Sequence, residues 1–451
     1  MKNMLNCADM IFKNSNIPDR TKFALLGYQN ENPHLAYKKG LCQHDFEPGT
    51  FTLAEISLKA KFLKKRISFK QWLDDVLEQE LSLLKKLYPS LFLKSSLEEI
   101  KLGVEKILNA QTEKGEPLKN EIWFQEYSDI FRRIILFLLS FNPDYELDLY
   151  PDLTHKRKKL AFSVLNWIET NKKPNLWEWL SVSIAAGLMG VDEKSNHAAT
   201  SDIVRAYAIS LKAKCENEFD KISKIGELLW EISNTKTRID ATNNLRSTLE
   251  LREKTTIKIL TFPDDYIETI FLLKYFDVLL AEFHNIEIDC VPRSIRCCND
   301  ANYNDILTFI KFFPNLLKAS DRFRVRDQGP KLGTVNLLKL HSSILDLLLE
   351  ANIVDARGAR NYEMMQGINK ETYFGFMVCR EFSESTIGMF AEDRPLVYIR
   401  HSPNEKSFRE FRKRGRRIEH DHMLCTVTAF DNKEKWETGL SAKESSDENL
   451  K

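Results

Sequence analysis

Hydrophobic residues in the first half of the chain recur at helical spacing. Between Phe69 and Leu87, apolar residues return every three or four positions with charged residues between them, as in an amphipathic helix. The same pattern runs through residues 121–141, 159–171 and 202–214. We therefore predict an irregular N-terminal segment over residues 1–52 and a large all-helical domain over residues 53–250.

The pattern changes after Thr255 to strands that alternate with helices. Short apolar runs predict strands at 256–262, 286–291, 322–327, 352–357, 373–382 and 395–401. Longer amphipathic runs predict helices at 266–283, 302–313 and 335–351. Such alternation is typical of an α/β fold, here a three-layer α/β/α, Rossmann-like, mostly parallel sheet. We assign it to residues 251–435, as a metal- and phosphate-binding domain, and residues 436–451 to a charged tail.

Composition narrows the class of protein. Hydrophobic residues make up 43% of the 451 residues, and 66 Lys and Arg balance 65 Asp and Glu, for a net charge of +1. This balance does not favour nucleic acid or an anionic membrane as partner. The basic run Lys406–Arg417 leaves two interpretations open, a contact with nucleic acid or an acidic partner and a solvated charge run, and the near-neutral chain favours the second. No apolar run reaches membrane-spanning length, and the start of the chain lacks the features of a secretory signal. We expect a cytoplasmic protein with reduced cysteines.

Acidic residues follow the first two predicted strands. Asp264 and Asp265 come directly after the first, and the loop after the second ends at Asp300. Ligands of open α/β sheets bind beyond the carboxyl ends of the strands. Carboxylates gathered there repel one another without a cation, and their hard oxygens suit Mg²⁺ or Mn²⁺. Arg357, after the fourth strand, suits a phosphate group. An aspartate at a helix start can also be only a cap, and this alternative stays open for Asp300.

At these positions the chain resembles the metal-dependent damage-control phosphatases. These share the acidic-residue methyltransferase-like domain, also called domain of unknown function eighty-nine. The family has a strand ending in Asp-Asn-(Ala/Ser)-Gly, a loop with Asn-Asp or Ser-Asp, and a later Lys-Gly-x-x-Asn-(Tyr/Phe) motif. The matching segments are LTFPDDYIETIF (260–271), CCNDANYND (297–305) and RGARNYE (357–363). The helical segment WFQEYSDIFRRI (123–134) resembles a family helix as well.

The resemblance implies roles for individual residues. Asp264, Asp265 and Asp300 would be catalytic and would hold one divalent cation, Mn²⁺ or Mg²⁺, that binds a substrate phosphate oxygen. The substrate would be a small phosphorylated metabolite such as a sugar phosphate. Its binding residues would be Arg357, Gly358, Asn361, Glu126, Arg133 and Arg380, with Lys61 as a further contact.

Departures from the family pattern leave other functions open. Asp265 stands where the family has Asn, and Tyr266-Ile267 replaces a small Ala-Gly pair. One alternative is an S-adenosylmethionine-dependent protein carboxyl methyltransferase, although no glycine-rich turn follows the first predicted strand. The other is a catalytically degenerate family member that binds a phosphorylated metabolite or a protein.

Overall fold

The computed structural model describes fourteen stretches of the chain, and the helices and strands lie within them. The described residues are 35–42, 69–89, 97–111, 115–120, 122, 126–138, 151–190, 217–234, 239–251, 255–294, 300–329, 334–365, 368–377 and 396–402. Arg380, Lys61, the basic run 406–417 and the charged tail therefore lie outside them. None of the described helices combines the length and the apolar character that crossing a membrane requires.

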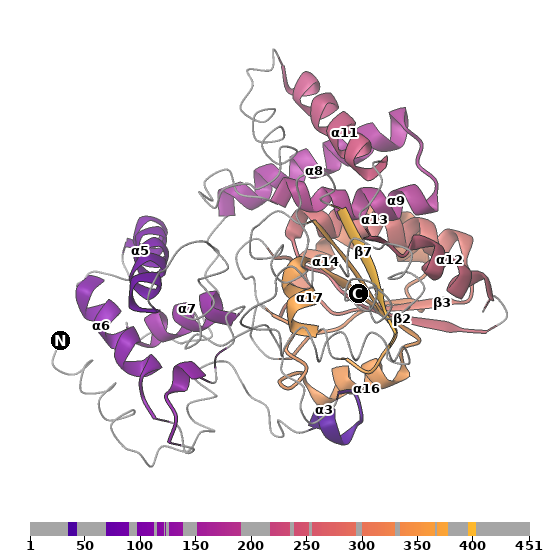
Figure 1. Ribbon diagram of the computed structural model, residues 1–451. Coiled ribbons are helices and arrows are strands. Elements are labelled where there is room, and N and C mark those ends of the chain that lie inside the picture. The colour runs from indigo at the N-terminus through magenta and orange to yellow at the C-terminus, as the bar shows by residue number, and fades with distance from the viewer. Residues whose placement is uncertain are drawn as a thin grey trace, which may run out of the picture.

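A seven-stranded sheet forms the centre of the described structure, in the order β1-β7-β6-β5-β2-β3-β4 (Figure 1). The strands are β1 Ile239–Asp240, β2 Ile257–Phe262, β3 Ile286–Cys290, β4 Phe323–Val325, β5 Ile353–Arg357, β6 Thr372–Met377 and β7 Leu396–His401. Neighbouring strands are parallel except β6 and β7, which are antiparallel. The predicted α/β fold with a mostly parallel sheet is confirmed.

Helices precede the sheet and connect its strands. In the first half they are α3 Leu35–Lys38, α5 Phe69–Leu87, α6 Leu97–Leu108, α7 Tyr127–Leu138, α8 Pro151–Asn171, α9 Leu176–Ala185, α11 Glu218–Asn234 and α12 Thr242–Leu251, with 3-10 turns η3 Leu118–Asn120 and η5 Ala186–Gly190. In the second half they are α13 Tyr266–Glu282, α14 Tyr303–Phe309, α15 Pro314–Lys318, α16 Ser342–Glu350 and α17 Ala359–Met365, with η6 Ile310–Phe312. The first half is thus predominantly helical where it is described, as its periodicity predicts.

Two hydrophobic cores cover the two faces of the sheet. On one face, Ile257 and Ile259 of β2 pack into a core shared by α8, α9, α11 and α13. On the other face, Leu260 and Phe262 join a core with α16, α17 and residues next to α3. Helix α13 is apolar on nearly all sides because it lies between the sheet and the helices of the first half. Residues of the helical half and of the sheet therefore share one continuous core.

Three local predictions need correction. Strand β1 lies inside the stretch predicted to be helical, and it pairs in parallel with β7 at Ile239↔Val397. The helix predicted at 335–351 is only α16, Ser342–Glu350. His341 caps its start by accepting the Ser343 N–H, and the apolar residues before it are buried in a segment that is not helical. The helix predicted at 302–313 is divided into α14 and η6.

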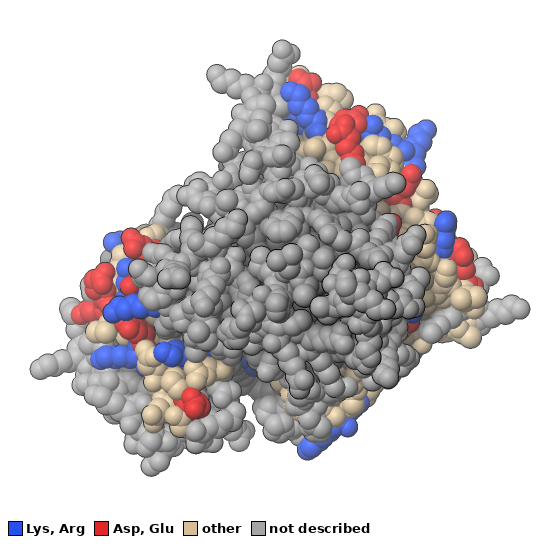
Figure 2. Space-filling view, viewed as in Figure 1, with Lys and Arg blue, Asp and Glu red and all other residues tan. Residues whose placement is uncertain are grey.

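Charge is mixed on the surface. Where described residues appear in Figure 2, acidic and basic side chains alternate, and no large area of one sign forms on that face. This distribution agrees with the near-neutral composition.

Candidate active site at the strand ends

Asp265 lies between strand β2 and helix α13, directly before the first residue of the helix. Its side chain accepts the backbone N–H groups of Ile267 at 2.7 Å and Glu268 at 3.0 Å, which makes it the N-cap. Burial raises the pKa of Asp265 to about 7, against the lowering effect of these hydrogen bonds. The cap role explains why α13 begins at Tyr266, and it occupies an oxygen that was expected to hold a metal.

Asp264 lies against the turn that follows β5. Gly358, in that turn, has φ +83°, and a Cβ there would lie 1.9 Å from the Asp264 Oδ2 atom. Only a glycine lets the backbone come so close. The turn after β5 and the end of β2 are therefore in direct contact, as the strand-end argument predicts.

Asp300 joins the same group of residues from the loop after β3. It forms an isolated antiparallel bridge with Asp265, and the N–H of the next residue, Ala301, donates to the Asp264 carbonyl at 2.9 Å. The Asp300 carboxylate is buried, and Arg360 Nη1 of α17 lies 3.4 Å from its Oδ2 atom. The structure thus brings all three predicted acids to one edge of the sheet.

Arg293 is the central residue of this edge, and the sequence analysis did not single it out. Its side chain is fully buried. Its Nη2 donates to Asp264 Oδ1 at 2.6 Å and to Asn361 Oδ1 at 2.9 Å, and its Nε lies 3.7 Å from Asp300 Oδ2. One guanidinium therefore connects residues that follow β2, β3 and β5. We call Asp264, Asp300, Arg293, Asn361 and Arg360 the strand-end cluster.

The predicted divalent cation does not fit these side chains as they stand. Among the described residues, no three acidic, histidine or cysteine side chains are arranged to hold a metal ion. Asp265 caps α13, and the Arg293 guanidinium contacts both Asp264 and Asp300. Mg²⁺ needs oxygens at about 2.0–2.1 Å, so a metal shared by these two carboxylates would compete with the guanidinium for space. The carboxylate oxygens have the right chemistry, but their charge is already balanced.

We predict from the sequence that Arg357 contacts a phosphate, and in the structure its guanidinium contacts side chains of the protein. It is buried, and its Nε donates to both Asp355 oxygens, at 3.0 and 2.9 Å. Its Nη1 donates to Ser183 Oγ of α9 at 3.2 Å. Thr261 of β2 donates to the same Asp355 at 3.0 Å. In this arrangement Arg357 connects β5 to the helical layer, and Asp355 connects β5 to β2.

Glu268 is a buried acid near this arginine. Burial raises the pKa of Glu268 well above its ordinary value, although the positive charge of Arg357 lowers it. Its Oε1 has no hydrogen-bond partner among the described residues. A Cβ at Gly187 in η5 would lie 3.3 Å from Oε2. Glu268 therefore lies against η5, and its raised pKa favours the neutral form of the carboxyl group.

The remaining predicted substrate contacts fall into three places. Asn361 is in the strand-end cluster and donates to the carbonyls of Phe262 at 3.2 Å and Arg357 at 2.8 Å. Glu126 contacts Lys339 at 2.9 Å and Asn336 at 3.0 Å, in the segment before α16. Arg133 is buried in α7. Within the described ranges, no hydrogen bond or ion pair joins Glu126 or Arg133 to the cluster.

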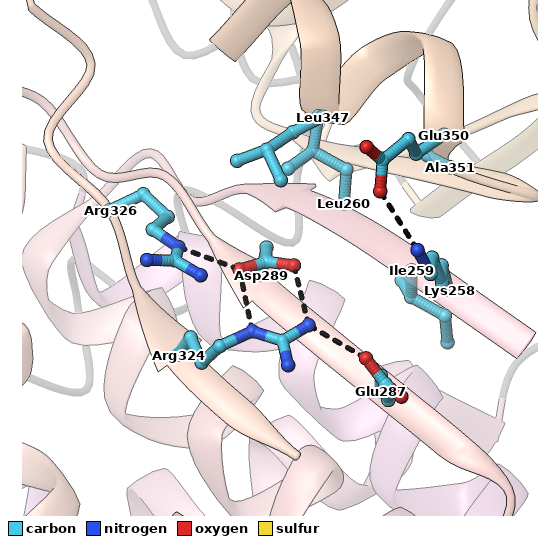
Figure 3. A pocket seen from close by; sticks show the side chains of 10 residues that line it. All are labelled: Lys258, Ile259, Leu260, Glu287, Asp289, Arg324, Arg326, Leu347, Glu350 and Ala351. Carbon is cyan, nitrogen blue, oxygen red and sulfur yellow. Dashed lines mark hydrogen bonds and ion pairs between the residues drawn. The ribbon is translucent and has the colours of Figure 1, made fainter. Parts of the chain in front are cut away.

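A separate hollow of about 260 Å³ lies on the α16 face of strands β2 to β4 (Figure 3). Its charged residues are already paired. Asp289 accepts from Arg324 at 3.0 and 2.9 Å and from Arg326 at 2.8 Å. Burial raises the pKa of Asp289, but these hydrogen bonds outweigh it and leave the pKa below its ordinary value. We prefer the strand-end cluster as the candidate site because it lies where open α/β sheets bind their ligands, beyond the carboxyl ends of the strands.

Two residues of the cluster, Arg293 and Arg360, were missed from the sequence. Both follow predicted strands, so taking every polar residue after each strand, rather than the acids, Arg357 and Asn361 alone, would have included them. Arg360 even lies within the RGARNYE motif.

Comparison with known proteins supports the fold. No protein-family model and no curated protein matches the sequence. Among solved structures, a DUF89 family protein from Pyrococcus horikoshii is similar, with a TM-score of 0.51 and 14% sequence identity. The match covers 73% of this chain and 96% of that one. At this identity, the likeness is one of fold, and it is the fold of the family that the sequence motifs resemble.

Proposed function

We propose that the protein is a DUF89-type phosphatase that hydrolyses small phosphorylated metabolites, such as sugar phosphates, at the strand-end cluster. The observation that carries the proposal is the meeting of Asp264, Asp300 and Asn361 with two arginines at the carboxyl ends of β2, β3 and β5. This is where open α/β sheets bind their ligands. The fold likeness to a DUF89 protein supports the family resemblance on which this proposal rests.

Two members of the cluster are accessible to a ligand. The side chains of Asp264 and Arg360 are 17% and 26% exposed, whereas those of Arg293 and Asp300 are 0% and 5% exposed. A guanidinium can bind a phosphate through two parallel hydrogen bonds, so Arg360 is the candidate phosphate contact. Asp300 orients Arg360, and Asp264 is the carboxylate that can face a bound phosphate ester.

The test is a phosphatase assay on a panel of sugar phosphates, run in Mn²⁺, in Mg²⁺ and in chelator. We expect turnover in at least one of these conditions. Asp264→Asn should lower kcat/KM at least about a hundredfold, as loss of a group that acts in the transition state does. Asp289→Asn, in the separate hollow, is the matched control and should leave kcat/KM unchanged. Turnover that survives Asp264→Asn would place the reaction elsewhere, and no turnover in any condition would reject the phosphatase proposal.

A second candidate is a protein that binds phosphorylated metabolites without hydrolysing them. Two observations favour it: Arg293 contacts both acids, and Tyr266, where the family has a small residue, packs its ring 4.8 Å from that of Phe309. Calorimetric titration with sugar phosphates distinguishes the candidates. Binding that Arg360→Ala abolishes, without turnover in the assay above, would favour the binding protein.

A further inference from the structure

The ion pairs of Arg293 differ from those of a purely structural arginine in the same protein. Arg324, in the separate hollow, grips Asp289 with two parallel hydrogen bonds of 3.0 and 2.9 Å. Arg293 instead makes one short contact to Asp264 and a long one, 3.7 Å, to Asp300. Its Nε and Nη1 atoms are buried and have no hydrogen-bond partner among the described residues. Its geometry is that of a positive charge held between two acids rather than of a fitted pair.

The position between those acids demands a cation. The Asp300 carboxylate is buried and the Asp264 carboxylate is largely so, and two such anions do not coexist without compensation. A divalent metal or a guanidinium can supply the charge, but both cannot occupy the same place. Arg293 reaches the position from the loop after β3 and is fully buried there.

We propose that Arg293 replaces a divalent cation in this protein, as a built-in counter-ion that holds Asp264 and Asp300. The wild-type protein then does not take up Mn²⁺ at the strand-end cluster, and removal of the arginine side chain opens a site for it. That site is lined by the oxygens that Arg293 now contacts, from Asp264, Asp300 and Asn361. All are hard oxygen ligands of the kind Mn²⁺ and Mg²⁺ prefer.

Electron paramagnetic resonance measures Mn²⁺ uptake directly and tests this inference with the 451-residue chain. We expect no saturable uptake by the wild type in millimolar Mn²⁺. Arg293→Ala should bind one Mn²⁺ per chain with a Kd at least about tenfold below any wild-type value, about 1.4 kcal/mol of binding free energy. Adding Asp300→Asn to that variant should abolish the gain. Arg326→Ala, which removes an arginine from a different buried acid, Asp289, is the matched control and should gain nothing.

Each result decides the question. Saturable Mn²⁺ uptake by the wild type that Asp300→Asn removes would overturn the proposal, and this measurement needs no arginine variant. If Arg293→Ala does not fold, Arg293→Gln, which keeps much of the side-chain volume without the charge, takes its place. A folded variant without Mn²⁺ affinity would also overturn it, because no latent cation site would then exist. The readout is metal binding, so failure of the phosphatase assay leaves this test unaffected.

Discussion

The contact between Gly358 and Asp264 gives the sharpest test of how the strand-end cluster is built. Two terms penalise Gly358→Ala. At φ +83°, an L-residue pays about 1–2 kcal/mol for left-handed backbone. The new Cβ would also lie 1.9, 2.4 and 2.6 Å from the Oδ2, Cγ and Cβ atoms of Asp264. Overpacking of this kind costs about 1–3 kcal/mol. We therefore expect a loss of roughly 2–5 kcal/mol in the free energy of unfolding.

A double-mutant cycle separates the two terms. Asp264→Gly removes all three atoms that the new Cβ would meet, so Gly358→Ala in that background should cost only the backbone term, about 1–2 kcal/mol. The coupling energy should then be about 1–3 kcal/mol. Gly40→Ala is the matched control, because Gly40 has φ +68° with no atom within 4 Å of a Cβ. It should cost the backbone term alone.

Urea unfolding followed by circular dichroism measures all of these free energies. A Gly358→Ala cost no larger than that of Gly40→Ala, or a coupling energy near zero, would refute the contact between the β5 turn and Asp264. It would also mean that the two strand ends do not meet as described.

Three further changes test other parts of the structure. Burial raises the pKa of Asp265 from 3.8 to about 7, so the folded state binds this proton more tightly. The stability that this group contributes is fully present below about pH 4 and is lost as pH rises through about 7. Asp265→Asn keeps the cap and should remove that loss. Urea unfolding at pH 8 should therefore find the variant more stable than the wild type by up to roughly 4 kcal/mol, and unfolding at pH 4 should find little difference. Equal stability profiles of the two proteins against pH would contradict the raised pKa of Asp265. Arg357→Ala leaves Asp355 buried without its arginine and should cost about 3–5 kcal/mol of unfolding free energy, whereas a raised KM at unchanged stability would support phosphate binding instead. Gly226→Ala would place a Cβ 2.3 Å from the Trp167 ring. The overpacking costs about 1–3 kcal/mol, which should outweigh the gain of about 1 kcal/mol in helix propensity, so the thermal unfolding midpoint should fall. A higher midpoint would show that the ring can move.

The alternation of apolar runs was enough to predict the sheet because most of its strands are buried on both faces. Such strands read as mostly apolar segments, as β6 (Thr372–Met377) does. Strand β1 was beyond this approach, since its two residues are too few to carry a period. The start of α16 was missed for another reason. Val335, Leu337 and Leu340 are buried, but the segment that carries them is not helical, and hydrophobicity alone does not report backbone conformation.

The sequence predicts where the candidate site lies better than it predicts which atoms contact one another there. Parallel strand ends gather whatever follows them, which is why Asp264 and Asp300 meet. Nearby protein groups compete with a ligand for the carboxylate oxygens and decide which of them remain available. Asp265 was expected on a metal, but the backbone of α13 takes its side chain. The buried state of Arg293 left no trace in the sequence, where an arginine in a loop reads as exposed.

The pairing of β1 with β7 has a consequence for biosynthesis. Ile239 finds its partner only at Val397, so this edge of the sheet cannot close while the intervening chain is still inside the ribosome. At ordinary rates of synthesis the wait is on the order of ten seconds. Through that interval β1 lacks its partner strand, and α9 lacks the part of its cover that β7 supplies. A truncation before β7 should leave both exposed permanently, and chaperone dependence during translation is expected to be greatest there.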